Sequence, residues 1–275
     1  MNRIPVLCYH SVSDEPSSWI AAMSVTPRQF GAHVRTILDL GRTPVRPAEV
    51  AAALTGGPPL PAGAVAITFD DGFAGVAEVA APLLADAGIP AAVYVTTGVV
   101  GGHSPGGDRM LTWRQIENLR AHGFEIGGHG HLHHQLDAVP RRIARADIVE
   151  CRDRLQDRLG RSPAGFAHPH GYSDRAVRRM VAEAGFTYAY GVRNRVCTST
   201  DDPFTISRLT VTAGTGAARL AAWLGDRDLP PQPWPRPVLV AGWRAYRRAR
   251  ALRGRPSPWT AGVPASASSD PQFTA

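Results

Sequence analysis

Residues 65–72 read VAITFDDG, and this stretch decides the fold. Its first five residues are apolar or β-branched and lie between Pro61 and Gly72, which is typical of a short buried strand. Asp70 and Asp71 follow where the strand ends. Adjacent side chains that leave a strand point in different directions, so one carboxylate can bind a metal ion while the other faces its water. An Asp-Asp-Gly turn that only caps a helix is the simpler alternative.

A second polar cluster follows another strand-like run. Residues 124–128, FEIGG, lead into a tract with four histidines in six residues. His129 and His133 are four residues apart, so one helical turn would bring them to the same side, and His-x-x-x-His commonly places two imidazoles on Zn²⁺. The alternative is a solvated polar loop or a loose metal-scavenging tract, and we interpret His131 and His134 as solvated members of that loop.

The two clusters together hold the parts of a mononuclear metal site with its own base. Catalytic zinc usually has about three protein ligands and a water molecule, and Asp71, His129 and His133 make such a set. Asp70 is then left to act as general base. Zinc lowers the pKa of a bound water from 15.7 to about 7, and a neighbouring carboxylate can take the proton as that water attacks. Co²⁺ or Ni²⁺ would also suit these ligands.

With these residues the chain resembles a polysaccharide deacetylase of the NodB-homology type, which is carbohydrate esterase family 4. Residues 68–72 match the first motif of that family, and residues 128–136 match the second, which runs His-Ser/Thr-x-x-His-x-x-Leu. The resemblance covers roughly residues 4–225. In that family the first Asp is the base, and the second Asp and both His bind the metal, which implies the same division of roles here.

The third motif departs from the family pattern. Residues 166–171, FAHPHG, lie where the family has Arg-x-Pro-Tyr-Gly or Phe-Ala-Tyr-Pro-Tyr-Gly. Both tyrosine positions are histidine here, His168 and His170, and the Arg that steadies the base in many relatives is absent at Ala167. The resemblance assigns the oxyanion contact to the backbone N–H of His170, and a backbone donor survives a side-chain change. A polar barrel rim, or extra donors in the substrate pocket, are the alternatives for the two histidines.

The general acid is expected from the start of the chain. Most relatives carry a late Leu-x-His-Asp motif whose His is the acid, but no His follows His170. Residues 5–10, PVLCYH, form another strand-like run that ends in His10. This run resembles the first strand of the branch that includes biofilm poly-N-acetylglucosamine deacetylases, where the acid comes from this strand. The resemblance therefore implies that His10 protonates the departing amine, with a capping or supporting His as the alternative.

Strand-like runs alternate with helical patterns along the chain, which predicts a parallel sheet. The strands are expected at residues 4–9, 65–69, 90–96, 124–128, 164–168, 187–191 and 205–211. Helices are expected from Thr26, Thr112, Pro140 and Ser173. About seven strands predict an α/β fold, an incomplete (β/α)7 TIM-like barrel, which is also the fold that the resemblance implies. In such barrels the chemistry lies at the C-terminal ends of the strands.

The basic charge is concentrated at one end of the chain. We predict a catalytic barrel in residues 1–229 and a Pro/Arg-rich extension in residues 230–275. Of the net charge of +7, the extension carries +6, which leaves +1 for the barrel. Residues 238–253 predict a basic amphipathic helix that docks on the barrel, on a protein partner or on an anionic membrane, and residues 256–275 have a disordered composition. No basic stripe interleaved with aromatics is present, so nucleic-acid binding is not expected.

The location is predicted to be cytoplasmic. The chain has three cysteines, an odd number without a Cys-x-x-Cys pair, which favours a reducing compartment. A strand-like run begins by residue 4 and no run of about 18 apolar residues exists, so neither a signal peptide nor a spanning helix is predicted. The basic helix would allow contact with the inner face of the membrane. Unless translation begins upstream, the substrate would be an intracellular precursor or a small N-acetylated molecule.

The expected function is that of a metal-dependent hydrolase that removes N-acetyl groups from an N-acetylated sugar or polysaccharide and releases acetate. One alternative is a hydrolase of the same superfamily that cleaves a non-sugar amide. The other is a non-catalytic carbohydrate-binding relative, for which the changed third motif and the missing late His leave room.

Overall fold

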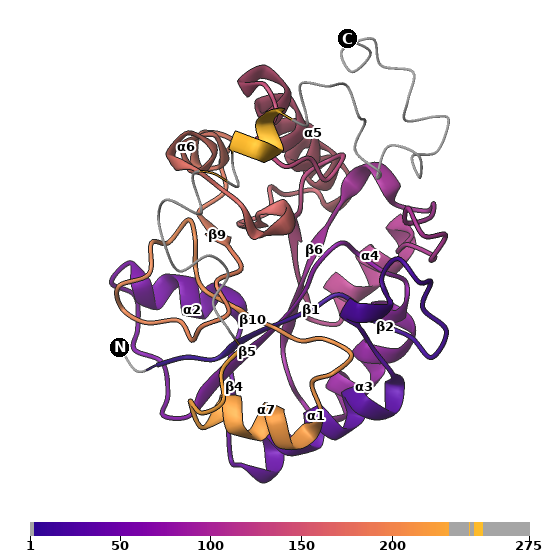
Figure 1. Cartoon of the computed structure of the whole chain (residues 1–275), viewed down its shortest axis with the longest axis vertical. Coiled ribbons are helices and arrows are strands. Elements are labelled where there is room, and N and C mark those ends of the chain that lie inside the picture. Colours follow the sequence, from indigo (N-terminus) through magenta and orange to yellow (C-terminus); the bar gives the residue numbers. More distant parts are fainter. Residues whose placement is uncertain (1–2, 231–241, 243–244, 250–275) are drawn as a thin grey trace.

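The computed structural model describes residues 3–230, 242 and 245–249 (Figure 1). Within them, an eight-stranded sheet curls around an interior and every strand pair in it is parallel. Its order is β10-β1-β5-β6-β7-β8-β9, and β4 pairs with β5. The strands are β1 (Val6–Tyr9), β4 (Thr43–Pro44), β5 (Ala64–Phe69), β6 (Ala91–Val95), β7 (Glu125–Gly128), β8 (Gly165–Ala167), β9 (Tyr188–Tyr190) and β10 (Leu209–Thr210). The α/β prediction of an incomplete barrel is confirmed, and each expected strand overlaps an observed one.

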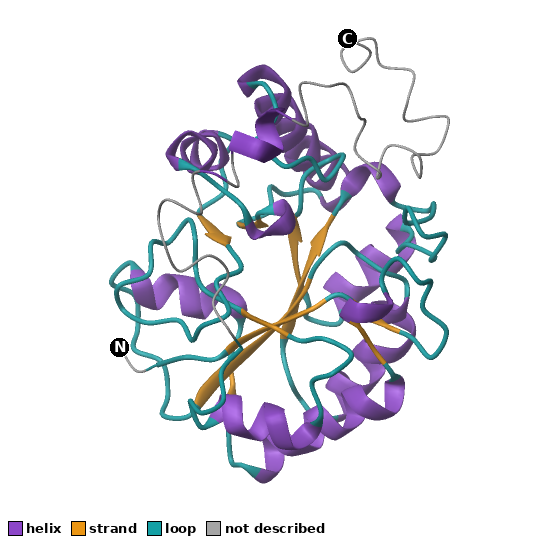
Figure 2. Cartoon of the chain, in the orientation of Figure 1, coloured by secondary structure: helices purple, strands orange, loops and turns teal. Residues whose placement is uncertain are grey.

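Helices surround the sheet on its outer side (Figure 2). They are α1 (Pro27–Asp39), α2 (Pro47–Leu54), α3 (Ala81–Asp86), α4 (Trp113–Ala121), α5 (Arg141–Leu159), α6 (Arg175–Glu183) and α7 (Ala217–Leu224). The predicted caps hold at Thr26, whose hydroxyl accepts from the N–H of Gln29, and at Thr112. The start of α6 differs by one residue, because Asp174 rather than Ser173 accepts the N–H of Val177.

The two faces of the strands pack differently, as the two-residue period of a strand requires. Ile67 and Val93 point to the outer core, which the surrounding helices cover. The alternate positions Ala66 and Ala92 face the inner core, which is built largely from small residues and tyrosines such as Tyr94. The small residues leave room for the aromatic rings where the sheet curls.

The segment that carries β10 contacts both edges of the sheet. Ile206 forms a parallel bridge with Tyr190 of β9, and Leu209 pairs with Leu7 of β1. Arg208 lies between these two contacts. The segment therefore crosses the gap in the incomplete barrel and carries a charged side chain into it.

Only part of the C-terminal extension belongs to the described residues. Residue 242 and residues 245–249 are helical, within the predicted helix at 238–253. The predicted disordered tail, residues 256–275, lies outside the described residues, and the domain boundary near residue 229 stays a prediction. Arg247 and Arg248 contact carboxylates of the barrel, as the docked alternative predicts. Among the described helices none is long and apolar enough to cross a membrane.

Candidate active site

Polar residues gather at the C-terminal ends of neighbouring strands. His10 follows β1, the pair Asp70 and Asp71 follows β5, and His129 follows β7. His168 directly follows β8. Because these strands are parallel and adjacent through β6, their ends meet at one edge of the sheet. This is the edge at which barrels of this kind carry their chemistry.

Asp71, His129 and His133 place three possible metal-ligand atoms close together, and we call these three residues the donor group. Asp71 Oδ1 lies 3.2 Å from His129 Nε2 and 3.1 Å from His133 Nε2, and the two Nε2 atoms are 3.2 Å apart. The three residues are at most 5% exposed. Ligands about 2.0–2.1 Å from a tetrahedral zinc lie roughly 3.3 Å from one another. The three separations therefore fit one face of such a coordination sphere.

The protonation pattern also fits a cation. The carbonyl oxygen of Ala167 lies 2.8 Å from His129 Nδ1, and because a carbonyl can only accept, Nδ1 carries the proton. When the ring is neutral, it presents the lone pair of Nε2 to Asp71, whose Oδ1 is buried without a hydrogen-bond donor among the described residues. Lone pairs that converge in this way need a positive charge between them. These residues fit a divalent metal ion.

The charge of Asp71 is maintained despite its burial. Burial alone would raise the pKa of Asp71, but the contacts with His129 and His133 outweigh it and hold that pKa well below its ordinary value. Asp71 is therefore ionised at neutral pH, which is the form that binds a metal.

The backbone around these residues adopts an uncommon conformation. Asp71, His133 and His170 have φ values of 71°, 52° and 58°, in the left-handed region that non-glycine residues rarely occupy. The predicted helical turn between His129 and His133 is wrong, because this tract is a loop in which Gly130 also has a positive φ of 78°. Strained residues of this kind gather at functional sites, where the surrounding structure holds them in place.

Asp147 of α5 holds that loop. Its Oδ1 accepts the backbone N–H of His131 at 2.9 Å, and its Oδ2 accepts that of Leu132 at 2.8 Å. His134 Nδ1 lies 2.8 Å from the same Oδ2. A Cβ on Gly130 would lie 2.5 Å from Asp147 Oδ1, so only glycine allows this approach. Asp147 thus fixes the loop between the two histidines of the donor group.

The interpretation of two histidines as solvated members of the loop is wrong. His131 is buried, and its Nδ1 lies 3.0 Å from the hydroxyl of Thr97. His134 is half-buried and pairs with Asp147. Both side chains therefore attach the loop to neighbouring parts of the barrel. The spacing of the histidines in the sequence did not indicate this role.

Replacing Asp147 with Asn should weaken zinc binding about 10- to 100-fold, the usual range for partners that orient metal ligands. The amide has one accepting oxygen instead of two, so either the N–H of His131 or that of Leu132 loses its acceptor. The measurement is zinc affinity by competition with a chelating dye. Asp157→Asn, at an exposed position on the same helix, is the matched control. Equal affinities for the two variants would contradict the role assigned to Asp147.

Asp70 is bound by an arginine that the sequence did not indicate. Arg208 Nη1 donates to Asp70 Oδ1 at 2.7 Å, and Nη2 donates to Oδ2 at 2.6 Å. Arg208 is completely buried, and it also donates hydrogen bonds to the hydroxyl of Thr68 and the carbonyl of Gly191. The position of Ala167 indeed lacks the arginine, but Arg208 supplies a guanidinium to the carboxylate from the other edge of the sheet.

The arginine sets the charge of Asp70. Burial alone would raise the pKa of Asp70, but Arg208, with His129, outweighs burial and lowers that pKa below its ordinary value. The thiol of Cys8 adds a long hydrogen bond to Asp70 Oδ2 at 3.5 Å. Asp70 is therefore an ionised carboxylate held in a fixed orientation.

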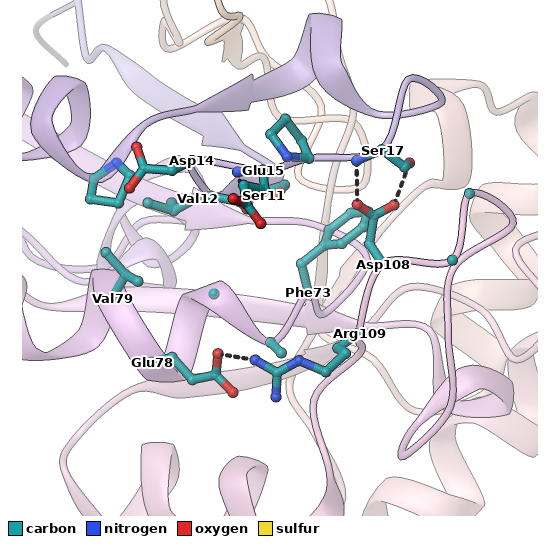
Figure 3. A pocket seen from close by; sticks show the side chains of 17 residues that line it. Ser11, Val12, Asp14, Glu15, Ser17, Phe73, Glu78, Val79, Asp108 and Arg109 are labelled. Atoms are coloured by element: carbon teal, nitrogen blue, oxygen red, sulfur yellow. Dashed lines mark hydrogen bonds and ion pairs between the residues drawn. The ribbon is translucent and has the colours of Figure 1, made fainter.

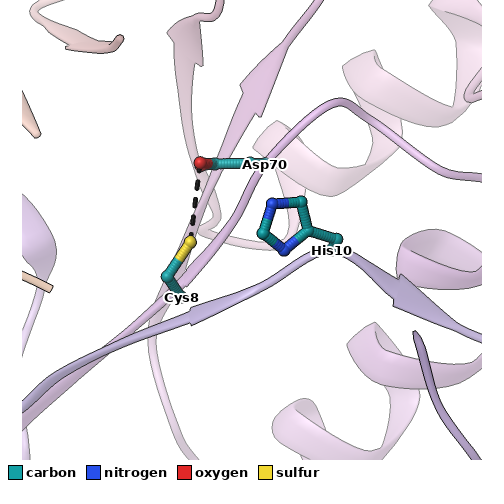
Figure 4. Close-up of side chains that lie close together, drawn as sticks. All are labelled: Cys8, His10 and Asp70. Carbon is teal, nitrogen blue, oxygen red and sulfur yellow. Dashed lines mark hydrogen bonds between the residues drawn. The ribbon is translucent and has the colours of Figure 1, made fainter. Parts of the chain in front are cut away.

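His10 lies next to this carboxylate. Ligand-type atoms of Cys8, His10 and Asp70 lie within 4.8 Å of one another, and Figure 4 shows the imidazole ring beside Asp70. His10 is only partly buried, whereas the other two are buried. Its Nδ1 is buried and has no hydrogen-bond partner among the described residues. The imidazole therefore has a nitrogen available for a further partner.

The two histidines of the third motif differ. His168 is fully buried, its Nε2 lies 2.8 Å from the carbonyl oxygen of Phe204, and burial lowers its pKa to about 4. It is therefore a neutral core residue, and the interpretation as an exposed rim is wrong for it. His170 is exposed, and its ring lies edge-on to that of His133 with centroids 4.5 Å apart. Only His170 borders the donor group.

A hollow of about 530 Å³ lies next to these strand ends (Figure 3). Residues 11–17, 73–75 and 106–109 form most of its wall. The first two segments directly follow the strand ends that carry His10 and the Asp pair. Asp108 joins the first and third segments, because its carboxylate accepts from the N–H of Ser17 at 2.7 Å and from its hydroxyl at 2.6 Å. The hollow is thus polar and its walls are bonded to each other, and the residues of the donor group are not among those that line it.

Comparison with known proteins shows what this chain is similar to. The model of the polysaccharide deacetylase family matches residues 57–189, which include Asp70, Asp71, His129 and His133. YxkH of Bacillus subtilis (strain 168), a candidate polysaccharide deacetylase, is 22% identical over 222 residues, which is 81% of this chain and 76% of YxkH.

Two solved structures share the fold. IcaB from Ammonifex degensii is 28% identical, with a TM-score of 0.71 over 82% of this chain and 97% of that one. The deacetylase PplD of Streptococcus pyogenes, in complex with acetate, is 21% identical, with a TM-score of 0.71 over 80% and 96% of the two chains. The chain thus resembles polysaccharide deacetylases in the family model that it matches, in a curated relative and in its fold.

Proposed function

We propose that this protein is a metal-dependent N-deacetylase that hydrolyses the acetamido group of an N-acetylated sugar. The proposal rests on one observation: Asp71, His129 and His133 form a group next to Asp70, which is ionised and bound by an arginine. The similarity to polysaccharide deacetylases supports the reaction class. A purely carbohydrate-binding relative would gain nothing from a second, separately oriented carboxylate beside the donor group.

The donor group would hold the metal ion. An ion with one carboxylate and two imidazole ligands is most often Zn²⁺ in hydrolases, and Co²⁺ or Ni²⁺ also suits these ligands. When bound, the ion activates a water molecule and polarises the carbonyl of the substrate. All further chemistry that we assign belongs to side chains and backbone groups of the chain.

The residues divide the proton transfers between them. Asp70 takes a proton from the attacking water, because it is ionised and Arg208 holds it in place. The backbone N–H of His170 donates to the amide oxygen as that oxygen becomes negative. His10 then protonates the amide nitrogen as the carbon–nitrogen bond breaks. The products are acetate and a free amino sugar.

The position of His10 supports this assignment as the acid. It lies beside Asp70 at the end of β1, its ring is partly open to solvent, and its buried Nδ1 has no partner among the described residues. The alternative interpretation, a supporting histidine, would require such a hydrogen bond.

Replacing His10 with Ala should lower kcat about 100- to 10,000-fold, the usual contribution of a general acid, and leave zinc affinity unchanged. The reason is that the departing amine would then have to leave without a proton. Single-turnover acetate release and zinc stoichiometry are the measurements. His122→Ala, at an exposed position after α4, is the control. Parental turnover in His10→Ala would end the assignment.

The function is tested by acetate release from the purified full chain, before and after chelation and after return of Zn²⁺. The substrates are N-acetylglucosamine, chito-oligosaccharides of increasing length, nucleotide-sugar and lipid-linked precursors, and N-acylated amides without a sugar. We expect metal-dependent acetate release from the sugars. Release from non-sugar amides alone would favour the second hydrolase class. Glycan binding without acetate release from metal-replete protein would favour a binding module.

A further inference from the structure

Arg247, in the described part of the C-terminal extension, is bound to the barrel through both terminal nitrogens of its guanidinium. Its Nη1 and Nη2 donate to the two carboxylate oxygens of Asp137 at 2.6 and 2.7 Å, and Nη1 reaches the side chain of Gln135 at 3.4 Å. The guanidinium also lies over the ring of Tyr172, 4.0 Å from its centroid. Arg247 is 6% exposed and Asp137 is 1% exposed. This is a buried, bidentate ion pair with an aromatic platform, not a surface contact.

The groups that Arg247 joins belong to two different loops of the site. Asp137 lies four residues after His133, on the loop that follows the donor group. Tyr172 lies two residues after His170, on the loop of the third motif. The rings of His133 and His170 meet edge-on at a centroid distance of 4.5 Å. The two loops are thus in contact at the site itself and again, further out, through Arg247.

The next residue makes the same connection. Arg248 Nε donates to the carbonyl oxygen of Asp137 at 3.0 Å, and its Nη2 lies 3.3 Å from Asp174 Oδ2. Asp174 is the residue that caps α6, immediately after the third-motif loop. Figure 1 shows this short helix, in yellow, near α6. Each of these two adjacent arginines therefore contacts both the loop after His133 and the segment of the third motif, at Tyr172 or at Asp174.

From these contacts we infer that Arg247 is a positioning residue for the reaction. It clamps the loop that carries His133 to the loop that carries His170, and the C-terminal extension is a working part of the active site. The inference rests on the proposed function, since it assigns a purpose to the relative placement of a metal ligand and an oxyanion donor. His133 and His170 both have positive φ, a conformation that needs support from outside the loop.

Arg247 acts through its planar fork, which a point charge does not replace. Lysine has one ammonium group and binds a carboxylate through a single point, so it cannot hold both oxygens of Asp137 while lying flat on Tyr172. Arg247→Met removes the charge and keeps much of the length of the side chain. Comparing the two variants therefore separates the fork from mere attachment of the extension.

The test uses the full chain and compares the parent with Arg247→Met, Arg247→Lys and Tyr172→Leu. Arg145→Met is the control, because Arg145 also pairs with a carboxylate at 2.7 Å, that of Glu183, but at the surface and away from both loops. Zinc affinity, the absorption spectrum of the Co²⁺ form, kcat and KM for acetate release, and the thermal unfolding midpoint are measured for each protein. All binding and kinetic measurements are made well below the unfolding midpoint.

We expect Arg247→Met to bind zinc roughly tenfold more weakly, to change the Co²⁺ spectrum and to lower kcat more than it raises KM. Arg247→Lys should recover only part of this loss, and Arg145→Met should match the parent. A lower unfolding midpoint with unchanged zinc affinity, spectrum and kcat would show that Arg247 serves stability alone and would overturn the inference. If Arg247→Met does not fold, parental values in both Arg247→Lys and Tyr172→Leu overturn it.

The failure of the inference and that of the proposed function are distinguishable. If the parent releases no acetate from any substrate, the proposed function fails. Zinc affinity and the Co²⁺ spectrum still decide in that case whether Arg247 holds the loop of His133 in place.

Discussion

Replacing Asp70 with Asn is expected to lower kcat for acetate release by about a thousandfold, within the range usual for loss of a general base. The amide cannot take a proton from the attacking water. The donor group of Asp71, His129 and His133 is untouched, so zinc should still bind with a stoichiometry of one. Steady-state acetate release and metal analysis of the same preparation measure both quantities.

The control for this prediction must separate chemistry from folding. Asp86→Asn, at an exposed position on α3, changes the same functional group and should leave kcat unchanged. Asp70→Asn also weakens one hydrogen bond from Arg208, so its unfolding midpoint is recorded alongside. A folded, zinc-loaded Asp70→Asn protein with more than a tenth of parental kcat would contradict the role of Asp70 as base.

Replacing Arg208 with Met is expected to lower the free energy of unfolding by about 3–5 kcal/mol, because it leaves the buried Asp70 carboxylate without its counter-charge. It should also reduce activity near neutral pH. Without Arg208, burial raises the pKa of Asp70, so more of this carboxyl is protonated and unable to act as base. The acid limb of the pH–rate profile should therefore move to higher pH. Denaturant unfolding and kcat/KM across pH measure the two effects.

The pH dependence of stability provides a second check on Arg208. In the parent, the lowered pKa of Asp70 contributes stability that is present above the ordinary pKa of about 3.9 and is lost as pH falls through the lower, folded value. Arg208→Met removes this contribution and raises the pKa of Asp70, so the stability difference between parent and variant should shrink as pH falls from the raised pKa of the variant to the lowered pKa of the parent. Arg219→Met, at a largely exposed position on α7, is the control. The double variant with Asp70→Asn should regain part of the lost stability, because no unpaired charge is then buried.

Local patterns were sufficient to predict seven of the eight strands of the sheet, all but β4, and the residues of the donor group. The run that ends in Asp70 and Asp71 is apolar, short and bounded by turn residues, and the structure makes it β5. Parallel order then brings His129 to the same edge, because neighbouring parallel strands end together. The sequence predicted which residues meet, although it misjudged the local conformation, since His133 reaches the group through a loop with positive φ.

The residues that support the site were missed because their partners are distant in sequence. Arg208 binds Asp70 across 138 positions, and the one signal that could have found it is a charge inside the strand-like run at residues 205–211. Asp147 interrupts the buried stripe of α5 formed by Ala144, Ile148 and Cys151, which is a comparable signal. Neither signal specifies a partner, because the curvature of the sheet decides which side chains meet.

His129 donates its Nδ1 hydrogen bond to the backbone carbonyl oxygen of Ala167. At this position the site therefore depends on the main chain and not on the side chain. Any residue that keeps β8 in register with β7 supplies that carbonyl, so the position can change its side chain without altering the tautomer of His129. The same holds for the N–H of His170 in our proposal. A search for relatives by side-chain motifs alone would therefore overlook active members whose third motif has drifted, whereas a search by strand register would retain them.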